Sequence, residues 1–328
     1  MSQTETPLAL PELPAVARRI VDQLLTGELL GASRNIRQIN DLFVIIAGQW
    51  PTQSSTELVA ALRATGDYLA ATRGRNTPAI ANAIRLVLKD IEQAAGMPMA
   101  EVRQLVEARR AEFNALSLSN ANLIAEYGAN SLAHCEAVVA FDYSSSQLAV
   151  LRRLAERGRH LRVIVPESRC LDGGRPVARE AAACGHSVVF FPDMAFSHFL
   201  RRADAVLIGA ETILANGDCW NTIGSYPLAV MADRVGVPYY VATELLKIDP
   251  LSFTGQQRPI RPRDYSDLLS YPGAFAHPEL ISVTAPDLDV VPGSLIRAYI
   301  TPVGVILPQH LWAETRKFLA ASGGEEPG

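Results

Sequence analysis

Five short apolar runs, separated by amphipathic segments, dominate the second part of this 328-residue chain. Short apolar runs without a helical period are typical of strands that are buried on both faces. Strands that alternate with helices of this length form a parallel sheet covered on both faces. The runs span residues 137–140, 161–165, 187–191, 205–208 and 239–242. They predict a Rossmann-like α/β domain.

The first part of the chain has a different pattern. Apolar residues recur at helical spacing over residues 15–30, 57–71 and 77–91, and no segment shows the alternation of a strand. The length suffices for two moderate cores. We therefore expect an all-helical N-terminal domain over residues 1–127, followed by the Rossmann-like domain over residues 128–328.

Composition excludes several functional classes. The formal net charge of −4 provides no basic field for a polyanion, so we expect no nucleic-acid partner. The four cysteines form no CxxC pair, the histidines show no metal-ligand spacing, and neither a GxGxxG fingerprint nor a Walker loop is present. We expect no metal and no cofactor. With no basic leader segment and no membrane-length apolar run, the sequence predicts a soluble, cytoplasmic protein without a membrane partner.

The stretch over residues 203–250 concentrates polar side chains between two predicted strands. It reads as strand, polar loop, helix and strand, and the loop carries Glu211, Asn221 and Thr222. Open α/β sheets bind ligands at the carboxyl ends of their strands. We therefore look for the functional site here first.

Three segments resemble one known family in their amino-acid sequence, their order and their spacing. They are IGAETILANGDCWNTIGSYPLA (208–229), RVIVPESRCLDGGRPVAREAAACG (162–185) and DVVPGSLIRAYITPVGVILP (289–308). The family comprises the regulatory subunits of translation initiation factor 2B, the methylthioribose-1-phosphate isomerases and the ribose-1,5-bisphosphate isomerases. The resemblance implies a helical domain, a Rossmann-like domain, a sugar-phosphate site between them and a homodimer formed through the C-terminal domains.

The resemblance also shows departures at the catalytic positions. Asp142 stands where the isomerases have their proton-moving cysteine, and Glu211 stands where they have an aspartate. Asn221 is kept, whereas Thr222 replaces a lysine. If Asp142 and Glu211 face one cavity, repulsion and burial would leave one carboxyl protonated and the other ionised, as an acid/base pair requires. The alternative is that both carboxylates merely bind neighbouring amides.

Phosphate recognition has several candidates. Arginine side chains suit bidentate contact with phosphate oxygens, and hydroxyls at a helix N-terminus offer an anion site. Solvated arginines and a serine that simply caps its helix are the alternatives. Asp193, after the run 187–191, could bind sugar hydroxyls or cap the next helix. The substrate- and phosphate-binding candidates are Arg73, Arg75, Ser144, Ser145, Arg169, Arg175, Asn221, Thr222 and Lys247.

Two functions fit these residues. The first is an isomerase that moves a proton on a phosphorylated pentose, with Asp142 and Glu211 as catalytic residues. The second is a non-catalytic regulatory or ligand-sensing subunit like those of initiation factor 2B, which keep the fold without the catalytic cysteine. The first hypothesis requires a phosphorylated sugar as substrate, and such a sugar is the partner that we expect.

Overall fold

Two compact units make up the chain in its computed structural model, which describes residues 9–26, 32–256, 258–260, 262–266 and 277–322. The first unit contains Met1–Ser119, Leu246–Pro250 and Thr315–Gly328, and the second contains Asn120–Leu245 and Leu251–Glu314. Helices α5 (Met99–Ser131) and α11 (Leu311–Ser322) each contribute residues to both units. The boundary expected between residues 127 and 128 stays a prediction.

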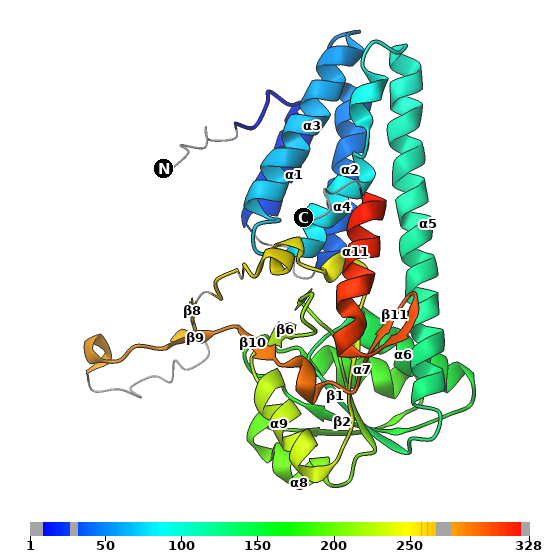
Figure 1. Cartoon of the computed structure of the whole chain (residues 1–328). Helices are drawn as coiled ribbons and strands as arrows, with labels where there is room; N and C mark the ends of the chain where they lie inside the picture. Colours follow the sequence, from blue (N-terminus) through cyan, green and yellow to red (C-terminus); the bar gives the residue numbers. More distant parts are fainter. Residues whose placement is uncertain (1–8, 27–31, 257, 261, 267–276, 323–328) are drawn as a thin grey trace. The chain divides into compact units, whose positions relative to one another are not determined.

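The first unit is helical, as the sequence predicts. Helices α1 (Ala15–Thr26), α2 (Ala32–Gln49), α3 (Ser55–Thr72) and α4 (Pro78–Val87) pack together with the start of α5 (Figure 1). Ser54 caps α3 by accepting a hydrogen bond from the Glu57 amide at 3.2 Å. Pro78 opens α4, where its missing N–H costs nothing.

The second unit is built on a seven-stranded sheet with the order β12-β11-β7-β4-β1-β2-β3. All neighbours pair in parallel except β11 and β12, which are antiparallel. All five predicted runs are strands of this sheet, so the predicted fold class is confirmed. The strands are β1 (Ala137–Phe141), β2 (Arg162–Pro166), β3 (Ser187–Phe191), β4 (Ala205–Ile208), β7 (Tyr239–Ala242), β11 (Ala298–Thr301) and β12 (Gly304–Ile306).

Helices cover both faces of the sheet. On one face α6 (Ser145–Glu156), α7 (Gly174–Ala183) and the end of α5 form a core with alternate strand residues (Figure 1). On the other face lie α8 (Phe196–Leu200) and α9 (Ser225–Val235), where the rings of Phe141 and Phe196 meet edge to face. Burial on both faces explains why these strands lack a polar alternation.

The segment between β4 and α9 is more ordered than the polar loop that the sequence predicts. It forms β5 (Thr212–Ile213) and β6 (Cys219–Thr222), which join β10 (Leu288–Val291) in a small antiparallel sheet. Its polar side chains Thr212, Asn221 and Thr222 are buried rather than solvated. Backbone pairing with β10, which is distant in sequence, turns this loop into part of the core.

The C-terminal elements complete the second unit. Strand β11 follows a 3₁₀ turn at Gly293–Leu295. Earlier in the chain, β8 (Pro262–Asp264) and β9 (Thr284–Pro286) pair as a small antiparallel sheet. Within the described part of the chain, no helix is both long and apolar enough to cross a bilayer.

Candidate functional site

Asp142 follows β1 directly, at the carboxyl edge of the parallel sheet. Its backbone lies in the left-handed region with φ 58°, which is uncommon for a residue other than glycine. The chain then turns into α6, whose N-terminus is capped by the Ser144 hydroxyl, which accepts from the Gln147 amide at 3.5 Å. The unusual backbone turns the Asp142 carboxyl toward the neighbouring strand ends.

Two hydroxyl groups hold that carboxyl. Ser168 Oγ donates to Asp142 Oδ1 at 2.8 Å, and Thr222 Oγ1 donates to Asp142 Oδ2 at 2.5 Å. Ser168 follows β2 and Thr222 ends β6, so three segments that are far apart in sequence meet at one side chain. Gly173 makes room for it, because a Cβ there would lie only 1.8 Å from Oδ1. Asp142 is 8% exposed.

Burial dominates the electrostatics of Asp142. Desolvation raises the pKa of its carboxyl, while the bonds from Thr222, Ser168 and the Tyr143 amide lower it and the charge of Asp193 raises it. The net direction is upward. Asp142 therefore holds a proton more readily than an ordinary aspartate, which suits a group that gives and takes protons.

Asp193 supports the site from the end of β3. Its Oδ1 accepts from the Ser168 amide at 2.8 Å and its Oδ2 accepts from the Arg169 amide at 2.9 Å. Ser168 is 2% exposed and has φ 48°, so this carboxylate stabilises a left-handed turn. Neither role that the sequence suggested for Asp193 includes this contact.

Glu211 lies beside the same small sheet. Its backbone N–H donates to the Trp220 carbonyl at 2.8 Å, next to Asn221 and Thr222 on β6. Asn221 Nδ2 donates to Ser225 Oγ at 3.0 Å, while Thr222 reaches Asp142. The structure thus brings Thr222 and Asp142 together, and it places Glu211 alongside the strand that carries Thr222. A shared ligand for the two carboxyls stays a prediction.

The phosphate-binding candidates belong to both units. Arg169 lies 3.8 Å from Glu167 and Arg175 lies 3.4 Å from Asp172, both as exposed ion pairs. Ser145 is the exposed first residue of α6. Arg73, Arg75 and Lys247 belong to the first unit. A phosphate contact by any of these residues, or by Ser144, stays a prediction.

Two further residues are not among the site candidates that the sequence predicts. Ser168 lies within the motif 162–185, and the pairing of β1 with β2 brings it to Asp142. Trp220 is 4% exposed, and its indole N–H has no hydrogen-bond partner within the described ranges. Trp220 and Thr222 lie two apart on β6 and share one face of it, the face toward Asp142. The signal for Trp220 in the sequence is a tryptophan within an otherwise polar stretch.

Thiol chemistry finds no support at this edge. Burial raises the pKa of Cys170, which lies in the same loop as Ser168 and contacts Tyr265. Burial also raises the pKa of Cys135 to about 11, at the opposite end of β1. Cys219 is completely buried. A thiol with a raised pKa is a poor nucleophile at neutral pH, so Asp142 is the better proton carrier.

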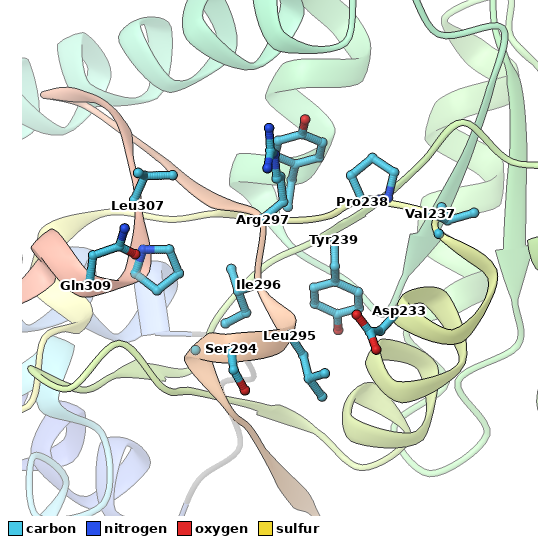
Figure 2. A pocket seen from close by; sticks show the side chains of 14 residues that line it. Asp233, Val237, Pro238, Tyr239, Ser294, Leu295, Ile296, Arg297, Leu307 and Gln309 are labelled. Carbon is cyan, nitrogen blue, oxygen red and sulfur yellow. The ribbon is translucent and has the colours of Figure 1, made fainter.

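A separate hollow of about 760 Å³ lies where β7 and β11 begin, at the amino edge of the sheet. Figure 2 shows its lining, which includes Asp233, Tyr239, Arg297 and Gln309. None of the residues predicted for the site lines it. Ligands of open α/β sheets bind at the carboxyl edge instead, so we assign the functional site to the surroundings of Asp142.

A mostly parallel sheet with helices on both faces defines an α/β protein. The profile of the Initiation factor 2 subunit family matches residues 30–308. The chain therefore belongs to the Initiation factor 2 subunit family, and the resemblance found in its motifs is confirmed.

Several relatives that match in sequence are named methylthioribose-1-phosphate isomerase. The methylthioribose-1-phosphate isomerase of Thermotoga neapolitana is 37% identical over 226 residues, which cover 67% of this chain and 64% of the relative. That of Desulforudis audaxviator is 35% identical over 231 residues, covering 69% of this chain and 64% of the relative. The matches thus span 64% of the length of each of these relatives.

Solved structures share the fold. The Pyrococcus horikoshii translation initiation factor eIF-2B has a TM-score of 0.74 at 23% identity, over 90% of this chain and 98% of its own. The 5-methylthioribose 1-phosphate isomerase of the same organism has a TM-score of 0.75 at 22% identity, over 93% of this chain and 87% of its own. Since these identities are low, the likeness concerns the fold alone.

Proposed function

We propose that this chain is a sugar-phosphate isomerase in which Asp142 and Glu211 move a proton on a phosphorylated pentose. The observation that carries the proposal is the buried Asp142 carboxyl, whose two oxygens accept hydrogen bonds from Ser168 and Thr222. The names of the isomerase relatives support the substrate class. An aldose–ketose isomerisation transfers one hydrogen from C2 to C1 of the sugar, so it needs acid/base groups and no net oxidant.

The proposed roles follow from the surroundings of the two carboxyls. Asp142, buried and with a raised pKa, accepts and returns the migrating proton. Glu211 serves as the second acid/base group, one methylene longer than the aspartate that the resemblance implies. The buried Trp220 N–H provides a donor for a sugar or phosphate oxygen.

The test is a panel of pentose 1-phosphates incubated with the chain in D₂O, with exchange at C2 followed by NMR. We expect exchange with one of them, and Asp142→Asn should reduce it about 10²- to 10⁴-fold, the usual contribution of an acid/base group. Asp67→Asn, an exposed carboxyl of α3, is the matched control. Turnover that Asp142→Asn leaves intact would remove Asp142 from the mechanism.

A second candidate is a non-catalytic ligand-sensing subunit. It is favoured by the fact that protein hydroxyls already occupy both oxygens of Asp142, which ties three loops together. In that case no sugar phosphate shows exchange, yet calorimetry detects binding of one of them to the wild-type chain. The same panel therefore separates the two candidates.

A further inference from the structure

Asp193 and Asp142 are connected through one buried hydroxyl. The Asp193 carboxylate accepts from two consecutive amides, those of Ser168 and Arg169, at 2.8 and 2.9 Å. The Ser168 side chain then donates to Asp142 Oδ1 at 2.8 Å. The series runs from the end of β3, through the loop after β2, to the end of β1.

The loop that carries Ser168 needs such a restraint. Ser168 and Asp172 both have left-handed backbones, with φ 48° and 52°, and such conformations persist only where surrounding contacts hold them. Other restraints on the loop are backbone hydrogen bonds, from the Glu167 amide to the Phe191 carbonyl at 2.9 Å, from the Leu171 amide to the Ser168 carbonyl at 3.2 Å and from the Gly174 amide to the Glu167 carbonyl at 3.2 Å. The amides of Ser168 and Arg169 both donate to Asp193 instead.

We propose that Asp193 is a positioning residue, which fixes the Ser168 hydroxyl so that Ser168 and Thr222 hold the Asp142 carboxyl in one orientation. The inference rests on the proposed function, in which Asp142 carries the proton. Asp193 touches no reacting atom in this scheme and acts only through Ser168. Thr222, on the other side of the carboxyl, is independent of Asp193.

Charge and geometry act in opposite directions on Asp142, which makes the inference testable. The negative charge of Asp193 raises the pKa of Asp142, while the bond from Ser168 lowers it. Cys170 is the other titratable group of the loop that interacts with Asp142. Asparagine at position 193 has no charge, and its single side-chain oxygen cannot accept from both backbone amides as the two carboxylate oxygens do. The restraint on Ser168 is therefore weaker as well.

The experiment is a double-mutant cycle in the full chain, using Asp193→Asn, Ser168→Ala and the double variant. The midpoint of the Asp142 carboxyl is read by ¹³C NMR with labelled aspartate, and its signal is assigned by its loss in Asp142→Asn. In the Ser168→Ala background only the charge of Asp193 matters, so Asp193→Asn should lower the midpoint. In the wild-type background the lost Ser168 bond opposes that shift, so the change should be smaller or reversed.

Equal shifts in the two backgrounds would overturn the inference, because Asp193 would then act by charge alone. Ser187→Ala, which removes a hydroxyl that donates to the Leu161 carbonyl, is the control and should leave the midpoint unchanged.

Kinetics provide a second readout. Ser168→Ala and Asp193→Asn should each lower kcat about 10- to 100-fold with little change in KM, as expected when a catalytic group is misplaced. The titration requires no substrate, so it decides the inference even if no sugar phosphate is turned over. Absence of turnover in the wild-type chain would count against the proposed function alone.

Discussion

At the scale of single residues, two buried titratable groups have shifted pKa values: Asp142 in the site and His186 at the amino edge of the sheet. Asp142 is a carboxyl at 8% exposure with a left-handed backbone, and its pKa is raised chiefly by burial. His186 is 4% exposed, and burial lowers its pKa. In both cases the shifted pKa means that burial disfavours the charged form of the side chain. Each predicts a measurable dependence of stability on pH.

Asp142→Asn should stabilise the fold at pH 7. The folded-state pKa of Asp142 lies above the unfolded value, so stability falls as the pH rises through that interval and stays reduced above it. Asparagine removes this penalty and still pairs with both hydroxyls. Each kcal/mol gained raises Tm by about 2–4 °C in a domain of this size. Thermal melts from pH 4 to 8 should show the difference shrinking toward acid, and parallel curves would contradict the prediction.

His186 should make the second unit sensitive to acid. Its Nδ1 accepts from the Leu161 amide at 3.0 Å, and its Nε2 lies 2.9 Å from the Leu151 carbonyl, so the ring is neutral. Below pH 6.5 the unfolded chain binds a proton that the folded chain refuses, so stability falls as the pH drops. Urea unfolding at pH 7.5 and 5.5 measures the fall. The loss of stability between the two pH values should be smaller in His186→Gln. It should be unchanged in the control His134→Gln, because His134 is exposed.

At the scale of elements, the site depends on how tightly the segment from β2 to α7 packs on the turn after β1. Gly173 precedes α7, and a Cβ there would lie 1.8 Å from Asp142 Oδ1 and 2.9 Å from the Tyr143 amide. The backbone of Gly173 has φ −74°, which is allowed for any amino acid. The requirement for glycine therefore comes from close packing and not from backbone conformation.

Gly173→Ala should displace the Asp142 carboxyl and cost about 1–3 kcal/mol of stability through overpacking. We expect loss of the Ser168 bond and a drop in any turnover. Gly48→Ala is the control, because Gly48 lies in α2 with no atom within 4 Å of the added Cβ, and it should be neutral or stabilising by about 0.5–1 kcal/mol. Equal unfolding free energies for wild type and Gly173→Ala would contradict this packing argument.

At the scale of the whole molecule, the homodimer implied by the family resemblance is a prediction about assembly. Light scattering on a sizing column should give twice the chain mass of 35.5 kDa at micromolar concentration. A mass of one chain that persists as concentration rises would refute the dimer. This measurement is independent of the site, so it tests the resemblance without reference to catalysis.

The elements were more predictable than the site. The parallel strands follow from local apolar runs, and the helices follow from 3.6-residue periodicity, both of which are properties of neighbouring residues. By contrast, β6 was read as part of a polar loop, because its partner β10 lies some 70 residues away in sequence. The sequence places Thr222 among the substrate-binding candidates, and only the structure reveals that its hydroxyl is bonded to Asp142.

The sequence by itself determined the family, the fold class and the position of Asp142 and Glu211 beside strand ends, since these depend on motifs and on the order of elements. Only the tertiary structure decided that Ser168, Thr222 and Asp193 surround the Asp142 carboxyl. These contacts join residues that lie 24 to 80 positions apart along the chain. The pairing of the parallel strands, together with the small antiparallel sheet that holds Thr222, brings such distant residues to one edge, and no local pattern records which side chains will meet there.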